Sequence, residues 1–217
     1  MPFNIIRQDI SLMDTDAVVS CGNAGLSAQG GVSGAIFRAA GEKLPAACMK
    51  LAPINTAQAV ITKGFDLKAR CIIHTLGPVY SEHTPEESIR LLRLTYSNCL
   101  ELAEKHCCRS IAFPLISSGQ FGFPKEEALK TAVQTIGDFL SGSEMDVYLT
   151  VYGGEAFAVS RSLIGGVRSY IDQNYVEAHP GRRNRAEYSE PERSFYFIAD
   201  EGPDMPDAFE SRAQDES

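Results

Sequence analysis

The segment Asp16–Gly41, DAVVSCGNAGLSAQGGVSGAIFRAAG, contains three parts from which the rest of the chain can be interpreted. It begins with Ala17–Val19, a run of apolar residues with two β-branched side chains, which favours a strand covered on both faces. A glycine-rich loop follows, and Val32–Ala40 then has the apolar spacing of a helix. Gly41 suits the left-handed position that ends many helices. The segment therefore predicts a strand, a loop and a helix, the repeating unit of α/β proteins.

The same alternation continues outward from this segment. Short runs rich in Val, Ile, Phe and Tyr predict six strands, at Phe3–Arg7, Asp16–Ser20, Ala59–Thr62, Cys71–Thr75, Ser110–Leu115 and Val147–Tyr152. Helical periodicity predicts four helices, at Val32–Ala40, Pro85–Ala103 behind an N-cap at Thr84, Pro124–Leu140 and Ala156–Asn174. This order predicts a mostly parallel sheet between helices, with ligands at the carboxyl ends of the strands.

The composition limits the kinds of partner. The chain of 217 residues is 44% hydrophobic, with a formal net charge of -8 and a pI near 5.1. This acidic balance disfavours a surface built to bind a nucleic-acid backbone or an anionic membrane. The N-terminal residues lack a signal-peptide pattern, and no run approaches the ~20 apolar residues of a membrane span, so we expect a cytoplasmic protein. The sequence does not reveal an oligomeric state.

The six cysteines do not form a metal-binding pattern. None is spaced C-x-x-C, and most are interpreted as reduced packing residues. The run His106-Cys107-Cys108 has donor atoms, but adjacent side chains point in different directions, so a zinc site would need distant partners. We predict neither a metal nor a cofactor.

The chain changes character after about Tyr175. Residues 176–217 are charged, rich in turn-forming residues and poor in β-branched ones, which predicts a linker or disordered tail. Within this stretch, Ser194–Ala199 is a short apolar run that could dock on the domain or on a partner. We therefore expect one domain over residues 1–175, followed by the tail.

The first loop that could carry chemistry is Ser20–Gly34. Its glycines would let the backbone approach a ligand, and the N–H groups at the start of the following helix favour an anion. The loop contains neither G-x-x-x-x-G-K-[ST] nor G-x-G-x-x-G, which disfavours a P-loop or a dinucleotide-binding unit. Glycine content alone leaves open whether this is a phosphate site or a tight turn.

The second such loop is Pro114–Pro124, which again runs from a predicted strand into a helix. It offers two hydroxyl groups, two glycines and a second helix N-terminus, which together favour another anion. No G-x-S-x-G surrounds Ser117 or Ser118, so these serines are interpreted as hydrogen-bond donors rather than nucleophiles. Two anion sites predict a diphosphate ligand.

Four groups of residues, in this order and spacing, make the chain resemble a macro domain. They are Gln8-Asp9-Ile10, Gly30–Ile36 with Arg38–Gly41 behind it, Ile73–Pro78, and Ile111–Pro114 followed by Ile116–Gly119. The resemblance covers residues 1–175. It implies a three-layer α/β/α fold around a mixed, mostly parallel six-stranded sheet, with ADP-ribose in a cleft across its top.

The resemblance also implies roles for individual residues. Asp9 would accept a hydrogen bond from adenine beside the Ile10 backbone, Tyr152 would pack on adenine, and Asn23 would contact the distal ribose. The diphosphate would lie between two groups, Gly30, Gly31 and Val32 on one side and Ser117, Ser118, Gly119, Gln120 and Phe121 on the other. By residue type alone, Asp9 could instead cap a turn, and Tyr152 could be a core residue. His74 is interpreted as structural.

The sequence departs from the pattern of many hydrolytic macro domains. It has Ser20–Asn23, SCGN, where they carry Asn-Ala-Ala-Asn, and Ser33 where they carry an aspartate. Ser33 would then lie beside the distal ribose with Asn23, the candidate catalytic residue. A serine hydroxyl cannot act as a general base near neutral pH, and a positioned base contributes typically ~10² to 10⁴ in rate. Ser33 could also be a helix N-cap.

Three functions follow from this reading. The leading hypothesis is a module that binds ADP-ribose, free or attached to a protein or metabolite. The alternative is a hydrolase that removes ADP-ribose from modified proteins or deacetylates O-acetyl-ADP-ribose, with Asn23 orienting a water and the bound diphosphate serving as the base. The third is a reader of RNA or of poly-ADP-ribose ends, which the acidic balance of the chain disfavours.

Overall fold

The structure, a computed structural model, describes residues 3–151 of the chain. The expected helix Ala156–Asn174, the domain boundary near residue 175, the tail 176–217 and the candidate ligand residue Tyr152 lie outside the described residues. Within the described residues, no helix is long and apolar enough to cross a membrane.

Six strands form one mixed sheet in the order β1-β6-β5-β2-β4-β3. All neighbouring pairs are parallel except β3 and β4, which are antiparallel. The strands are β1 (Phe3–Ile6), β2 (Ala17–Cys21), β3 (Ala59–Lys63), β4 (Cys71–Thr75), β5 (Ser110–Pro114) and β6 (Asp146–Thr150). The mixed, mostly parallel sheet expected from the sequence is confirmed, and its strand ends lie within two residues of the predicted ones.

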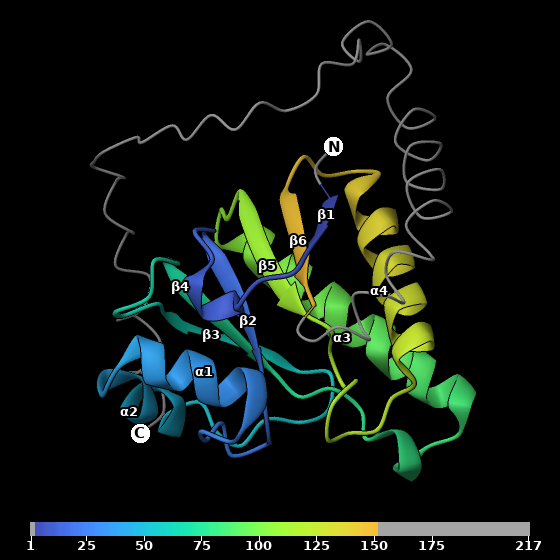
Figure 1. Cartoon of the computed structure of the whole chain (residues 1–217), viewed down its shortest axis with the longest axis horizontal. Coiled ribbons are helices and arrows are strands. Elements are labelled where there is room, and N and C mark those ends of the chain that lie inside the picture. The colour runs from blue at the N-terminus through green and yellow to red at the C-terminus, as the bar shows by residue number, and fades with distance from the viewer. Residues whose placement is uncertain (1–2, 152–217) are drawn as a thin grey trace, which may run out of the picture. The chain divides into compact units, whose positions relative to one another are not determined.

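Helices cover both faces of this sheet (Figure 1). On one face lie α1 (Gly31–Ala40), α2 (Lys43–Met49) and the short 3-10 helix η1 (Ile10–Leu12), and on the other lie α3 (Pro85–Lys105) and α4 (Lys125–Leu140). A second 3-10 helix, η2 (Tyr80–Glu82), precedes α3. The three-layer α/β/α architecture is therefore confirmed for the described residues.

Each face of the sheet buries its own hydrophobic core. Alternate residues of β2 point to opposite faces, so Val18 packs with Ile36 and Leu44 from the α1 and α2 layer. Val19 packs instead with the layer of α3 and α4, which includes Leu92. Apolar residues on successive positions of a strand are thus explained by burial on both sides.

The sequence signals located the start of α3 but missed α2. The Thr84 hydroxyl accepts a hydrogen bond from Glu87 N–H at 3.3 Å, and Pro85 begins α3, as predicted. Helix α2 was not predicted, because it has only seven residues and Pro45 in its first turn. Its buried residues, Leu44 and Cys48, are four positions apart and place one side of this short helix on the core.

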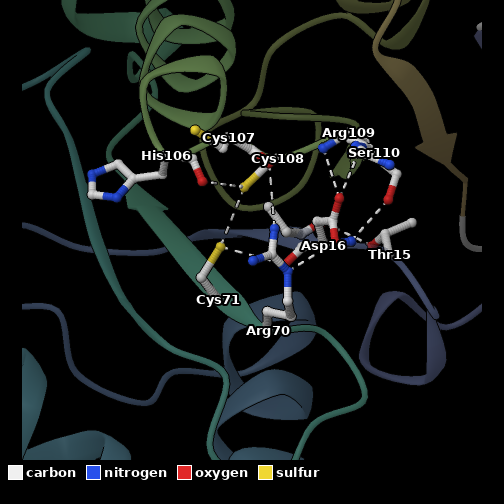
Figure 2. A network of polar contacts seen from close by, with 10 residues as sticks. Thr15, Asp16, Arg70, Cys71, His106, Cys107, Cys108, Arg109 and Ser110 are labelled. Atoms are coloured by element: carbon white, nitrogen blue, oxygen red, sulfur yellow. Dashed lines mark hydrogen bonds and ion pairs between the residues drawn. The ribbon is translucent and has the colours of Figure 1, made fainter. Parts of the chain in front are cut away.

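A carboxylate ties three segments together at the amino-terminal end of the central strands (Figure 2). Asp16, next to β2, accepts hydrogen bonds from Arg70 Nε at 2.8 Å, from Arg109 N–H at 2.6 Å and from Ser110 N–H at 3.2 Å. The Ser110 hydroxyl lies 2.8 Å from Asp16 N and accepts its hydrogen bond. The beginnings of β2, β4 and β5 are therefore held in one network, away from their carboxyl ends.

Candidate functional site

A pocket of about 350 Å³ opens where β2 and β5 end. Both predicted loops contribute to its walls, so segments nearly 100 residues apart in the sequence meet there. The lining residues are Cys21, Gly22, Gln29, Gly30, Gly31, Val32, Ser33, Pro114, Leu115, Ile116, Ser117, Gly119, Gln120 and Phe121. The carboxyl edge of a parallel sheet is where ligands of α/β proteins bind, and this pocket is therefore the candidate site.

The first wall is the loop from β2 into α1. Gly30 is the N-cap of α1, and Gly31 has φ +65°, a left-handed conformation that residues with a Cβ rarely adopt. No atom lies within 4 Å of the position that a Cβ would take on either glycine. The start of a ten-residue helix, with its unpaired N–H groups, thus borders open space in the pocket.

The second wall is the loop after β5, and it is shaped by hydrogen bonds to its neighbours. Tyr80 N–H donates to the Phe121 carbonyl at 2.9 Å, and Phe123 N–H donates to the Ser117 carbonyl at 3.0 Å. The loop therefore folds back before α4 begins at Lys125. The sequence predicted a second helix N-terminus at the site, but the pocket is lined by residues of the loop up to Phe121 and not by the start of α4.

Ser117 is the most constrained residue of this wall. It has φ +62° and is 6% exposed, and its Oγ has no hydrogen-bond partner among the described residues. A Cβ on Gly77 would overlap Ser117 Oγ and Ile116 Cγ2, which explains why glycine stands at position 77. A buried hydroxyl without a partner costs free energy unless a ligand or water satisfies it. Ser117 Oγ lies beside Gly77, buried within this wall.

The Tyr96 side chain supports the same loop from below. Its hydroxyl donates to the Pro114 carbonyl at 3.2 Å and accepts from Ile116 N–H at 3.1 Å. The ring is fully buried and contacts Phe113, with centroids 5.2 Å apart. Burial raises the pKa of Tyr96, so this hydroxyl stays protonated and keeps both hydrogen bonds. One residue of α3 thus fixes the backbone on either side of Leu115.

The lining is uncharged. Among the described residues that form it, none carries a carboxylate, an imidazole, an ammonium or a guanidinium group. An anion bound there would be held by backbone N–H groups, hydroxyls and the end of a helix rather than by ion pairs. The same lining offers no side chain that could act as a general base near neutral pH, because burial raises the pKa of the Cys21 thiol.

Ser33 lies inside α1, not at its cap. The N-cap is Gly30, so the alternative that Ser33 caps the helix is wrong. The side chain is buried, and its Oγ lies 3.5 Å from the Ser27 carbonyl. A Cβ on Gly22 would lie 3.4 Å from that Oγ, so Ser33 faces the β2 side of the pocket.

Asn23 does not line the pocket; instead its side chain joins a local turn. Its Nδ2 donates to Ser27 Oγ at 2.8 Å, and its Oδ1 accepts from Ser27 N–H at 3.2 Å. Ser118 is likewise absent from the lining, and its hydroxyl donates to the Leu115 carbonyl at 2.8 Å. Both residues are in the predicted loops, but the structure directs their polar atoms to neighbouring backbone and side chains.

Asp9 and Ile10 lie at the same edge of the sheet, next to β1, but not in the pocket lining. Asp9 is the N-cap of η1, and its Oδ1 accepts hydrogen bonds from Ser11 N–H at 2.9 Å and from Ser11 Oγ at 2.8 Å. Ile10 is buried in the core beneath α1. The geometry is that of the capping alternative, and a role for Asp9 in adenine binding stays a prediction.

Other lining residues were not predicted as ligand contacts. Cys21, Gly22, Gln29, Pro114, Leu115 and Ile116 belong to the quoted loops, but their types carry no signal for phosphate. His74 is not part of the pocket lining. Its Nε2 lies 2.9 Å from Thr62 Oγ1 and 3.8 Å from Cys48 Sγ. The described residues contain no group of three or more potential metal ligands, and all six cysteines are free thiols.

The comparisons with known proteins agree with this fold and pocket. The macro domain family profile matches residues 19–132. A macro domain-containing protein of Chlorobaculum tepidum is 45% identical over 145 residues, 65% of this chain and 84% of the relative. An O-acetyl-ADP-ribose deacetylase of Salmonella typhimurium is 43% identical over 159 residues, 70% of this chain and 87% of the relative. A solved structure of the Oceanobacillus iheyensis macrodomain with ADP has a TM-score of 0.72 and 34% identity, covering 76% and 90% of the two chains.

Proposed function

This chain belongs to the macro domain family, and we propose that its pocket binds ADP-ribose, free or as a modification on a protein or metabolite. The name of the Salmonella relative contains ADP-ribose, and the Oceanobacillus structure contains ADP. The ligand predicted from the two loops, a diphosphate, agrees with both.

The observation that carries the proposal is the pair of uncharged walls. The start of α1 with Gly30 and Gly31 faces one side of the pocket, and the loop with the unpartnered Ser117 hydroxyl forms the other. Two groups of hydrogen-bond donors across one cavity suit two linked phosphates better than one. An ATP-type P-loop, which uses a lysine, has no counterpart in this lining.

Hydrolysis is the second candidate, because a relative 43% identical is named an O-acetyl-ADP-ribose deacetylase. The described lining supplies no general base, so water attack would have to use an oxygen of the bound diphosphate as the base. Asn23 would orient that water only after releasing Ser27. These requirements favour binding as the main activity and a slow hydrolysis at most.

Calorimetric titration of the full chain with ADP-ribose and with AMP tests the proposal. ADP-ribose should bind more tightly, because the second phosphate and the distal ribose reach the second wall. Equal affinity for the two ligands would show that only one wall is used. Release of acetate from O-acetyl-ADP-ribose, measured on the same sample, separates a binding module from an enzyme: turnover of at least ~1 s⁻¹, the lower end of typical enzyme rates, would favour the enzyme.

A further inference from the structure

Two thiols face each other at the end of the sheet opposite the pocket. Cys71 is the first residue of β4, and Cys108 precedes β5 by two positions. Their Sγ atoms are 3.7 Å apart, although 37 residues separate them in the chain. In Figure 2, a dashed line marks the contact between the two sulfurs, that of Cys71 in β4 and that of Cys108 in the turn before β5. Both residues are buried, with exposed fractions of 3% and 6%.

The surroundings give the two sulfurs different roles. Either sulfur can donate the hydrogen bond between them. With Cys71 as the donor, this bond lowers the pKa of Cys108 while burial and Asp16 raise it, and the nearby Arg70 guanidinium lowers the pKa of both thiols. The pKa of Cys71 is raised by the same hydrogen bond and by burial, so this thiol keeps its proton. Arg70 is fixed beside the pair by Asp16 Oδ1 at 2.8 Å and reaches the Cys107 carbonyl at 3.5 Å. With Cys71 as the donor, Cys108 is the better nucleophile of the two.

The remaining thiols lack this arrangement. Cys48 lies against His74. Cys99 lies against Thr75, and Cys21 is near enough to raise the pKa of Cys99, but among the described residues only Cys71 and Cys108 have their sulfurs in hydrogen-bond contact. Cys107 is exposed and has φ +54°. It adjoins Cys108 in the turn that enters β5. Formation of a disulfide would bring the two sulfurs from 3.7 Å to ~2.05 Å apart.

We propose that Cys71 and Cys108 form an oxidation site, at which hydrogen peroxide converts the two thiols into a reversible disulfide. The Cys108 thiolate attacks one peroxide oxygen, the O–O bond breaks, and the leaving hydroxide takes up a proton to become water. Cys108 is then a sulfenic acid. The Cys71 sulfur, releasing its proton, attacks the Cys108 sulfur, the S–O bond breaks, and a second water leaves. Two thiols lose two electrons, and the peroxide is reduced to two waters.

The full chain, reduced and then treated with hydrogen peroxide, tests this assignment. After denaturation, alkylation of free thiols and proteolysis, mass spectrometry should find the peptides of Cys71 and Cys108 linked, with four of the six thiols still alkylated. Dithiothreitol should restore all six. In Cys71→Ala the link should be lost and a sulfenic acid should be trapped at Cys108 by dimedone, whereas Cys48→Ala should keep the link.

Two results would overturn the proposal. One is a link between Cys107 and Cys108, or oxidation of Cys107 alone, when the wild-type chain is treated. The other is the same mixture of links in folded protein and in protein oxidised in urea, because a site made by the fold must pair Cys71 with Cys108 only when folded. The wild-type map decides both points, so the assignment stays testable even if Cys71→Ala fails to fold.

Discussion

Ser33 is the single residue on which the choice between binding and catalysis depends most. It is the third residue of α1 and lies under the β2 side of the pocket, facing Gly22. A carboxylate at that position would be in the first turn of the helix, where the helix dipole favours a negative charge. Ser33 lines the pocket, so a carboxylate at position 33 would supply the base that the lining lacks.

We expect Ser33→Asp to raise hydrolysis of O-acetyl-ADP-ribose by about tenfold or more, because a positioned base contributes up to ~10² to 10⁴ in rate. Affinity for ADP-ribose should stay within about tenfold, since the new charge repels the diphosphate only in part. Acetate release and calorimetry measure the two separately, with Ser33→Asn as the control that adds bulk without charge. If the wild type already turns over as fast as Ser33→Asp, the serine is no deficit and the chain is better described as a hydrolase.

The residue types in the two loops predicted part of the pocket lining, but not which side chains face the pocket. Glycines and serines in the two loops indicated donors for an anion, and Gly30, Gly31 and Ser117 do line the pocket. Asn23 and Ser118 belong to the same loops, but short-range hydrogen bonds to Ser27 and Leu115 take their polar atoms. Such competition depends on the backbone path of the loop, which residue types do not specify.

At the scale of elements, the loop after β5 is positioned by a helix, α3, that contributes no residue to the pocket lining. The Tyr96 hydroxyl in α3 holds the backbone at Pro114 and Ile116, immediately before Ser117. The Ser117 backbone has φ +62°, a conformation that persists only when its surroundings impose it. We therefore infer that α3 sets the geometry of one wall of the pocket through this hydroxyl.

Tyr96→Phe should weaken ADP-ribose binding by about tenfold while lowering the free energy of unfolding by about 1 to 3 kcal/mol, because a buried N–H and a carbonyl lose their partner. Calorimetry and urea unfolding measure the two effects. Thr135→Val is the matched control, since it removes a buried hydroxyl whose hydrogen bond, to the Thr131 carbonyl, stays within α4. Equal losses of affinity in both variants would mean that general stability, not loop position, explains the result.

Elements with long, regular patterns were predictable. The 21-residue α3 carries its Thr84 cap and buries Leu92, Tyr96, Leu100 and Ala103 at helical spacing, as expected. Helix α2 was missed because a seven-residue helix presents too few turns for a periodic signal. The start of α4, expected at the pocket as a second helix N-terminus, is not among the lining residues. The hydrogen bond from Tyr80 to Phe121, which helps to shape this loop, joins residues distant in sequence.

At the scale of the whole described domain, the sheet separates two hydrophobic cores and carries a buried imidazole on the α1 face. His74 in β4 packs edge-on against Phe37, with centroids 6.3 Å apart, and lies 2.9 Å from Thr62 Oγ1. Burial lowers its pKa from 6.5 to about 4. The folded domain therefore keeps this imidazole neutral at pH values where the unfolded chain is protonated.

His74 should make the domain less stable as the pH falls from 6.5 to about 4. The contribution of His74 to stability is fully present above pH 6.5, because His74 is unprotonated there in both the folded and the unfolded chain. Below pH 6.5 this contribution is lost, because only the unfolded chain binds the proton. The slope is at most about 1.4 kcal/mol per pH unit. In urea unfolding at several pH values, the free energy of unfolding should change less with pH for His74→Gln than for the wild type. An equal pH dependence in the two proteins would mean that other groups, for example the carboxylates, cause the acid sensitivity.

The direct test of the central claim, that ADP-ribose lies against the start of α1, is a titration of Gly30→Glu. Gly30 lines the pocket and has an ordinary φ of -64°, and a Cβ there would meet no atom within 4 Å beyond its chain neighbours. Gly142→Glu is the matched control, because Gly142 is also open but lies before β6, outside the pocket lining. The proposal predicts that Gly30→Glu keeps the wild-type unfolding curve and loses ADP-ribose affinity by at least about 100-fold, while Gly142→Glu binds normally. Normal binding by Gly30→Glu would contradict the placement of the diphosphate in this pocket.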